Sequence, residues 1–280
     1  MLQALNVAER RLHEAGVAEP RIEAELLLAK VMGTDRGGLL ARHADPLDAV
    51  TRRRYEDWLA RRMARVPFQH LTGTQEFFGL DFAVDSHVLI PRPETEGIVE
   101  AVLDLDLPPA ARVVDLGTGS GCLAITLAVQ REDLAVVALE RSKQALRVAR
   151  RNLLRHRVED RVELVLGDWN EAPELWHGTM HAVVSNPPYV TESEWSELQP
   201  EVRDHDPREA LVPGPTGLEA YAELIPVARR LLGPGGQLVV ELGAGQSDRV
   251  GEWVSAGGFT VAGVRPDLNG IPRVLVARKR

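Results

Sequence analysis

Residues 112–121 read RVVDLGTGSG, and this stretch decides the fold of the 280-residue chain. The apolar run that ends at Leu116 is typical of a buried strand, and the apolar residues after Gly121 indicate a helix to about residue 129. Glycines at such a junction let the backbone approach a ligand closely, and the helix N-terminus adds unpaired N–H groups. The spacing is G-x-G-x-G, with Cys122 where a dinucleotide-binding loop has its third glycine.

Strands and helices alternate along the chain that follows. The predicted strands span residues 112–116, 135–140, 162–166, 181–185, 237–242, 259–264 and 273–277. This alternation is typical of a parallel sheet covered by helices on both faces. Because no helix separates the last two strands, they should pair antiparallel at an edge. We therefore predict an α/β fold with a Rossmann-like, mainly parallel, seven-stranded sheet.

Polar residues follow the second and third predicted strands. Glu140 can accept hydrogen bonds from both ribose hydroxyls of a nucleoside, or it is only a helix-capping acid. Asp168 can accept from an adenine amine, and Trp169 can stack beside the ring or lie in the core. With Asp115 at the head of the glycine loop, these strand ends resemble those of class I S-adenosylmethionine-dependent methyltransferases. That resemblance implies that the loop passes under the amino-acid part of the cofactor; its residues are Gly117, Thr118, Gly119, Ser120 and Gly121.

The fourth predicted strand ends in the tip Asn186-Pro187-Pro188-Tyr189. The two prolines fix two φ angles, and the residue before a proline is kept extended. The result is a rigid tip that presents an amide side chain, free carbonyls and an aromatic ring. Such a tip either binds a planar NH2 group or is only a rigid turn, and these four residues alone leave both interpretations open.

The N-terminal part differs in character, because residues 1–66 show helical periodicity and no strand pattern. Asp45-Pro46 suits the cap and first residue of one of these helices. We predict an N-terminal helical bundle over residues 1–68, a β-hairpin and linker over 69–93, and a methyltransferase domain over 94–280. Two basic runs, Arg52-Arg53-Arg54 and Arg61-Arg62, indicate either a solvated helix face or a contact to RNA or a ribosome-associated partner.

The composition limits the classes of function. The formal net charge of -8 argues against broad electrostatic capture of nucleic acid. The single cysteine, Cys122, excludes an internal disulfide, and the chain shows neither a signal-peptide pattern nor an apolar run of about 20 residues. The dispersed histidines give no metal-ligand spacing. We expect a cytoplasmic protein without metal, membrane or direct nucleic-acid partners.

Several stretches together resemble the peptide chain release factor glutamine N5-methyltransferase family, also called PrmC or HemK. They are Glu76–Phe82, Leu89–Glu96, Asp115–Gly121, Val184–Tyr189, Glu201–Arg203 and Gly217-Leu218, so the resemblance spans essentially the whole chain. It implies methyl transfer from S-adenosylmethionine, with S-adenosylhomocysteine as product, to the glutamine of the Gly-Gly-Gln motif in class 1 release factors. It also implies that residues 1–68 recognise the release factor.

The same resemblance assigns roles to individual residues. It implies that Gly117–Gly121, Glu140 and Trp169 contact the cofactor, that Asn186 adjoins it, and that Asn186–Tyr189 hold the glutamine. The chain departs from the family pattern at three places. Glu140 stands where Asp is frequent, Pro215-Thr216 replace a glycine and an acid, and His205-Asp206-Pro207 stands where Glu-Pro is common. Glu140, one methylene longer, should still reach the ribose, and the other two departures concern details of the acceptor loop. The expected reaction is unchanged.

The tip also predicts a mechanism. An amide nitrogen is a poor nucleophile because its lone pair is delocalised into the carbonyl. The Asn186 side-chain oxygen and the Pro187 carbonyl would accept the NH2 hydrogens and stabilise the positive charge that develops, while Tyr189 would hold the amide plane. Two alternatives remain: a methyltransferase for the exocyclic amine of adenine (N6) or guanine (N2) in nucleic acid, and a non-catalytic adaptor that binds S-adenosylmethionine.

Overall fold

The computed structural model describes residues 1–42 and 45–280. The chain divides into two compact units, one of Met1–Gly73 with Gln199–His205, and one of Thr74–Leu198 with Asp206–Arg280. The first unit thus includes a short segment that lies far along the chain. No helix in the described part of the chain is long and apolar enough to cross a membrane.

The first unit is a helical bundle. Its helices are α1 (Leu2–Glu14), α2 (Pro20–Met32), α3 (Arg36–Ala41), α4 (Ala49–Met63), α5 (Phe68–Thr72) and α10 (Pro200–Arg203). Buried side chains from these helices form one apolar core, among them Leu5, Leu12, Leu27, Leu39 and Leu59. The predicted helix start at Asp45-Pro46 is wrong, because Asp48 is the N-cap of α4. Its side chain accepts from the backbone N–H groups of Val50 and Thr51, both at 2.9 Å.

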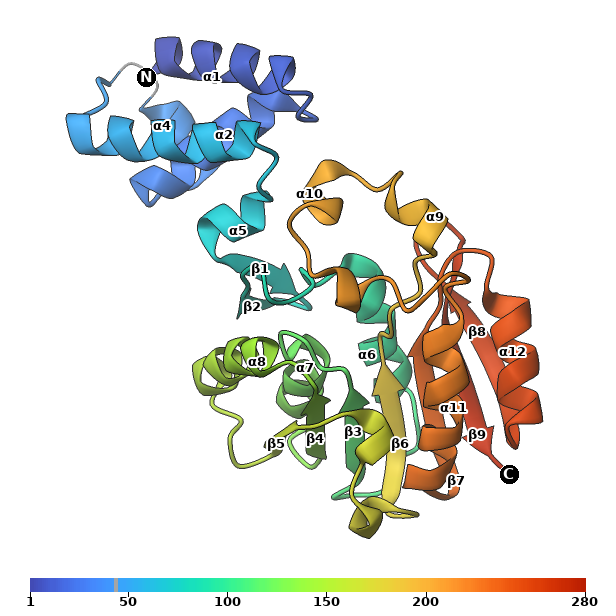
Figure 1. Cartoon of the computed structure of the whole chain (residues 1–280). Coiled ribbons are helices and arrows are strands. Elements are labelled where there is room, and N and C mark those ends of the chain that lie inside the picture. The colour runs from blue at the N-terminus through green and yellow to red at the C-terminus, as the bar shows by residue number, and fades with distance from the viewer. Residues whose placement is uncertain (43–44) are drawn as a thin grey trace. The chain divides into compact units, whose positions relative to one another are not determined.

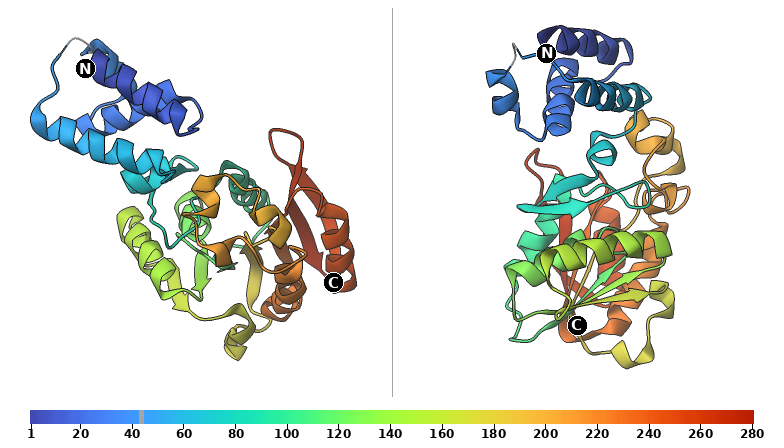
Figure 2. Two further views of the ribbon diagram at one scale, coloured as in Figure 1. Left: turned by 45° about the horizontal axis from the view of Figure 1, so that its top comes forward. Right: turned by 90° about the vertical axis from the view of Figure 1, so that its left-hand side faces the viewer.

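The second unit is built around a seven-stranded sheet with the strand order β5-β4-β3-β6-β7-β9-β8 (Figure 1). The strands are β3 (Arg112–Leu116), β4 (Ala135–Glu140), β5 (Val162–Leu166), β6 (Met180–Ser185), β7 (Leu232–Glu241), β8 (Phe259–Pro266) and β9 (Pro272–Lys279). Strands β3 to β7 pair in parallel, whereas β9 pairs antiparallel with both β7 and β8. Figure 2 shows β8 and β9, in red, as a long hairpin. The predicted fold class and its antiparallel edge pair are confirmed.

Helices cover both faces of this sheet because successive strand residues point to opposite faces. The helices are α6 (Glu96–Leu103), α7 (Cys122–Gln130), α8 (Lys143–His156), α11 (Glu219–Leu231) and α12 (Ser247–Ala256). Val113 of β3 lies in the core formed with α6, α7 and α8. Its neighbour Val114 lies in the core formed with α11 and α12. The two helix layers are visible on either side of the sheet in Figure 1.

The remaining elements lie mostly beside the carboxyl edge of the sheet. They are the hairpin β1 (Thr74–Phe77) and β2 (Leu80–Ala83), and the short helices η1 (Pro93–Thr95), η2 (Trp169–Glu171), η3 (Glu174–Trp176), α9 (Glu192–Trp195) and η4 (Arg208–Ala210). The chain runs from β3 outward to β4 and β5, and then returns to β6 on the other side of β3. In open α/β sheets ligands bind at this reversal, outside the carboxyl ends of the strands. The glycine loop and the Asn186–Tyr189 tip therefore start from adjacent strands at one edge.

Candidate active site

The glycine loop is held against the sheet by backbone hydrogen bonds. The N–H groups of Gly117 and Thr118 donate to the Leu139 carbonyl at 2.9 and 3.0 Å. Gly121, with φ 82°, is the N-cap of α7, and a Cβ there would meet the Ile125 side chain at 2.8 Å. The Ile125 side chain could move aside, but a side chain is strained at this φ whatever the space. The sequence predicts this glycine from ligand approach, and the structure adds the need for a positive φ at the start of α7.

Asn152 of α8 ties the loop to the hairpin and is a residue that sequence reasoning missed. Its side-chain amide donates to the carbonyls of Ser120 at 2.8 Å and Ala83 at 3.0 Å. Its oxygen accepts from the backbone N–H of Ala83 at 2.6 Å. Asn152 is completely buried, so these bonds form without competition from water. The sequence offers only one sign of this role: Asn152 is a polar residue on the apolar face of a predicted helix.

Glu140 lies at the end of β4, beside the glycine loop. One carboxylate oxygen accepts from the Gly119 N–H at 2.9 Å, and the other accepts from the Ser142 N–H at 2.8 Å. These bonds fix the carboxylate at the mouth of the loop. An ionised carboxylate has about four acceptor positions, so two remain for hydroxyl groups of a ligand. The helix-capping interpretation and the ligand-binding interpretation are thus compatible in this side chain.

Asp168 and Trp169 follow β5 and line the same side of the site. The Asp168 side chain accepts from the Asn170 N–H at 2.8 Å and caps η2. The indole N–H of Trp169 donates to Glu223 of α11 at 3.3 Å, and the ring packs against the core. A Cβ at Gly117 would lie 3.6 Å from the Trp169 ring, so the ring stands directly beside the glycine loop.

The Asn186–Tyr189 tip is anchored by hydrogen bonds at both of its ends. Ser185, the last residue of β6, donates its hydroxyl to the Leu116 carbonyl at 2.6 Å, which joins the tip to the strand that carries the glycine loop. The Asn186 side-chain N–H donates to the Thr95 hydroxyl at 3.0 Å. The Tyr189 hydroxyl donates to Glu241 of β7 at 2.9 Å. Sequence reasoning missed Glu241, for which an acid inside a predicted buried strand was the signal.

Gln246 holds the backbone of the same tip. Its side-chain amide donates to the Tyr189 carbonyl at 3.0 Å, and its oxygen accepts from the Gly243 N–H at 3.0 Å. Gly217, with φ 73°, passes so close that a Cβ there would lie 2.4 Å from the Tyr189 carbonyl oxygen. Glycine at this position therefore permits the close approach of the loop that precedes α11.

One cavity of about 450 Å3 brings most of these residues together. The predicted site residues that line it are Gly117, Thr118, Gly119, Ser120, Glu140, Asp168, Trp169, Asn186 and Pro188. The predicted site residues Gly121, Pro187 and Tyr189 are not among the residues that line the cavity. The volume lies in the range of small-molecule and cofactor sites. A glycine loop, a carboxylate with acceptor positions left over and an aromatic ring line this cavity, and together they fit a nucleoside with an amino-acid tail.

An ion pair lies at the cavity, and one of its members belongs to the lining. Arg92, from the loop before η1, contacts Asp206 at 2.8 Å, and the cavity lining continues through Pro207 and Arg208. Burial raises the pKa of Asp206 to about 6, although the nearby Arg92 guanidinium opposes that shift. Arg92 lies in a stretch that carries the family resemblance, whereas Asp206 lies in one that departs from the family pattern. The structure places the two side chains in contact.

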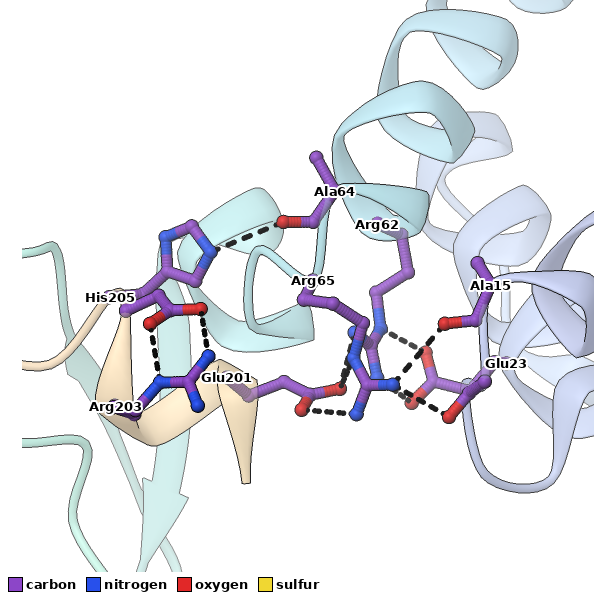
Figure 3. A network of polar contacts seen from close by, with 10 residues as sticks. Ala15, Glu23, Arg62, Ala64, Arg65, Glu201, Arg203 and His205 are labelled. Atoms are coloured by element: carbon purple, nitrogen blue, oxygen red, sulfur yellow. Dashed lines mark hydrogen bonds and ion pairs between the residues drawn. The ribbon is translucent and has the colours of Figure 1, made fainter. Parts of the chain in front are cut away.

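Residues adjacent to Asp206 in sequence belong to the helical unit. Figure 3 shows the carboxylate of Glu201, on α10, pointing toward Arg62 and Arg65 of that unit. Its carboxylate accepts from Arg62 at 2.8 Å and from Arg65 at 2.8 and 2.5 Å, and Arg62 also donates to Glu23 at 3.1 Å. Burial alone would raise the pKa of Glu201, but the hydrogen bonds from Arg65 and Arg62 outweigh it and lower that pKa.

This network corrects the interpretation of one basic run. Arg52, Arg53, Arg54 and Arg61 are exposed, whereas Arg62 is only 5% exposed and is bound by carboxylates. Arg62 is therefore neither part of a solvated face nor available to RNA. Adjacent residues of a helix point in directions about 100° apart, which separates Arg61 from Arg62.

Known family models and proteins resemble this chain over most of its length. Residues 3–73 match the family model of the PrmC N-terminal domain, and residues 98–201 match that of the Methyltransferase small domain. A release factor glutamine methyltransferase from Geobacter sulfurreducens is 44% identical over 267 residues, which cover 95% of this chain and 92% of that protein. Its counterpart from Nitratidesulfovibrio vulgaris is 40% identical over 280 residues, covering 98% and 94%.

A solved structure supports the fold alone. The crystal structure of a methyltransferase from Pyrococcus furiosus matches with a TM-score of 0.55 and 21% identity, covering 79% of this chain and 98% of that chain. The family resemblance found in the sequence is confirmed by the two family models and by relatives that match nearly the full chain. The chain belongs to the release factor glutamine methyltransferase family.

Proposed function

We propose that this protein transfers the methyl group of S-adenosylmethionine to the side-chain amide nitrogen (N5) of the glutamine in the Gly-Gly-Gln motif of class 1 peptide chain release factors. One observation carries the proposal: the glycine loop, Glu140 and Asn186 line the same cavity. The residues that we assign to a nucleoside and the tip that we assign to a planar NH2 group thus face one cavity. The products are N5-methylglutamine and S-adenosylhomocysteine.

The residues of the cavity divide into two sets. Glu140 would accept from the ribose hydroxyls, Gly117–Gly121 would lie under the amino-acid part, and Asp168 and Trp169 would contact the adenine. S-adenosylmethionine, when bound, supplies an electrophilic methyl group on a sulfonium. No residue in this scheme uses a metal ion. The described residues also hold no group of three or more His, Cys, Asp or Glu side chains arranged for one.

The tip would activate the glutamine by accepting its hydrogens. The Asn186 side-chain oxygen and the Pro187 carbonyl are the acceptors that we assign, and Pro188 and Tyr189 would confine the amide plane. Both acceptors stabilise the cationic character that grows on the nitrogen during attack. The hydrogen bond from the Asn186 N–H to Thr95 supports this assignment, because it leaves the amide oxygen for another donor. The N-methylated amide then loses its proton to water.

The reaction is tested with the purified protein, methyl-labelled S-adenosylmethionine and either a class 1 release factor or nucleic acid. Mass spectrometry should locate one added methyl on the Gly-Gly-Gln glutamine. A release factor with alanine in place of that glutamine is the control and should stay unlabelled. Label in adenine or guanine would establish the nucleic-acid alternative, and binding without turnover on either substrate would establish the adaptor.

We further propose that the helical unit recognises the release factor. A protein with this partner would act in the cytoplasm, where translation terminates. The exposed run Arg52–Arg54 on α4 would contact an acidic surface of that partner. Replacing these three arginines by alanine should raise the KM for the intact release factor and leave the KM for a Gly-Gly-Gln peptide unchanged. Equal changes in both values would contradict the recognition role.

A further inference from the structure

A chain of hydrogen bonds links three segments that are far apart in sequence. The Asn186 side-chain N–H donates to the Thr95 hydroxyl oxygen at 3.0 Å, and the Thr95 hydroxyl donates to one oxygen of Glu241 at 2.7 Å. The Tyr189 hydroxyl donates to the other oxygen of Glu241 at 2.9 Å. Thr95 ends η1, Glu241 ends β7, and Asn186 and Tyr189 belong to the tip after β6. One carboxylate therefore connects both polar side chains of the tip.

The direction of this chain follows from the chemistry of its members. When Glu241 is ionised, its carboxylate can only accept hydrogen bonds, so the single hydroxyl hydrogen of Thr95 points to Glu241. The Thr95 oxygen then has only lone pairs to offer to Asn186. The atom of Asn186 that faces Thr95 must therefore be the nitrogen, and the amide oxygen must point away from it. The donors and acceptors of Thr95 and Glu241 thus determine which way round the Asn186 amide lies.

The chain is shielded from water and anchored at its base. Glu241 is 1% exposed and Thr95 is 2% exposed, so water competes little for either bond. The Tyr221 hydroxyl donates to the Glu241 backbone carbonyl at 2.9 Å, and Arg273 donates to the next carbonyl, that of Leu242, at 3.3 Å. The end of β7 is therefore held independently of the tip that it supports.

We propose that Glu241 and Thr95 are positioning residues, which turn the oxygen of the Asn186 amide toward the acceptor group and fix the Tyr189 ring. This inference rests on the proposed function of the tip. It deepens that function by stating what the site accepts: an oxygen in this place receives a hydrogen from an NH2 group and repels a carboxylate oxygen. The site is therefore set for glutamine and against glutamate.

The chain of hydrogen bonds can be interrupted at the Thr95 hydroxyl. Thr95→Val preserves shape but removes the donor to Glu241 and the acceptor for Asn186, whereas Thr95→Ser keeps both. We expect Thr95→Val to lower the single-turnover rate of methyl transfer roughly 10- to 100-fold. The Kd for S-adenosylmethionine should stay within about two-fold, and Thr95→Ser should restore most of the rate. Binding should also become less selective: the ratio of the Kd for a Gly-Gly-Glu peptide to the Kd for a Gly-Gly-Gln peptide should fall roughly 10-fold in Thr95→Val.

A matched control is available in the same unit. Thr126 of α7 is completely buried, and its hydroxyl has no hydrogen-bond partner among the described residues. Thr126→Val should therefore leave both the rate and the peptide discrimination unchanged. Glu241→Gln is a second test, because an amide keeps one acceptor and cannot receive both hydroxyls; it should lower the rate as Thr95→Val does.

The outcomes separate the two proposals. If the wild-type protein fails to methylate the Gly-Gly-Gln glutamine, the proposed function is wrong. If the wild type methylates it but Thr95→Val and Glu241→Gln keep the rate within about two-fold, only the positioning role is wrong. Unchanged discrimination between the two peptides in a folded Thr95→Val variant would also overturn it.

Discussion

The carboxylate of Glu140 accepts the backbone N–H of Gly119 at 2.9 Å, so the residue that ends β4 also holds the middle of the glycine loop. A change at this residue removes two things at once: a bond that orders the loop, and the acceptor assigned to the ribose hydroxyls. Both losses act on the cofactor rather than on the glutamine.

Glu140→Ala should therefore raise the Kd for S-adenosylmethionine by roughly 100-fold, the equivalent of two lost hydrogen bonds of about 1.4 kcal/mol each. The rate at saturating cofactor should change far less. Isothermal titration calorimetry measures the Kd directly. Glu159→Ala, at an exposed position after α8, is the control. An unchanged Kd for Glu140→Ala would rule out its role at the ribose.

Asn186→Ala should affect the chemical step instead. By analogy with the removal of one oxyanion-hole donor, methyl transfer should slow roughly 10²- to 10³-fold. Cofactor affinity should stay within a small factor, because the assigned ribose and loop contacts are intact. Rapid-quench measurement of a single turnover gives the rate. Asn269→Ala, in the exposed turn between β8 and β9, should behave like the wild type. Near-normal turnover of Asn186→Ala would contradict the mechanism.

The stability of the fold should carry a pH dependence from Glu241. Burial raises its pKa to about 7, although the Thr95 and Tyr189 hydrogen bonds and Arg273 oppose the shift; Glu94 adds to it. A raised carboxyl pKa stabilises the folded state below the unfolded value of about 4.5, and this contribution is lost as the pH rises toward 7.

The unfolding free energy of the wild type should thus fall relative to that of Glu241→Gln by about 1.4 kcal/mol per pH unit inside this window. Burial also raises the pKa of Asp115 to about 7, but both proteins carry Asp115, so its contribution cancels in the difference. Urea denaturation of both proteins at pH 5, 6, 7 and 8 measures it. A difference that is independent of pH would show that Glu241 does not titrate there.

Arg62 should contribute far more to stability than its neighbour in sequence. Arg62→Leu leaves the carboxylates of Glu23 and Glu201 without this buried partner, which should cost about 3 kcal/mol. Arg61 is exposed, so Arg61→Leu should change the unfolding free energy by less than about 0.5 kcal/mol. Chemical denaturation of the two variants gives the comparison. Equal effects would mean that the ion pairs of Arg62 add nothing.

The sequence was sufficient to predict the features that depend on local order. Alternation of apolar runs predicts the sheet, and the residues that follow each strand predict which side chains meet at its carboxyl edge. Glu140, Asp168, Trp169 and Asn186 line one cavity as a result. Because these residues follow neighbouring parallel strands, their proximity can be predicted without knowledge of any long-range contact.

The features that depend on long-range contacts were not predictable in this way. Thr95 and Glu241 are 146 positions apart, and each has an ordinary local explanation in its own segment. Arg62 and Glu201 are 139 positions apart, and a basic run alone does not reveal which of its members is buried. Such pairs become visible only when the packing of separate segments is known.

The assignment of Gln199–His205 to the helical unit bears on how this protein can be taken apart. The backbone passes between the two units three times, after Gly73, after Leu198 and after His205. Two modules joined end to end would be linked by one such passage. A truncation that begins at Thr74 would therefore strip Glu201 of its arginine partners, and neither half is a portable module. Gene fusion or domain shuffling would have to move the two units together.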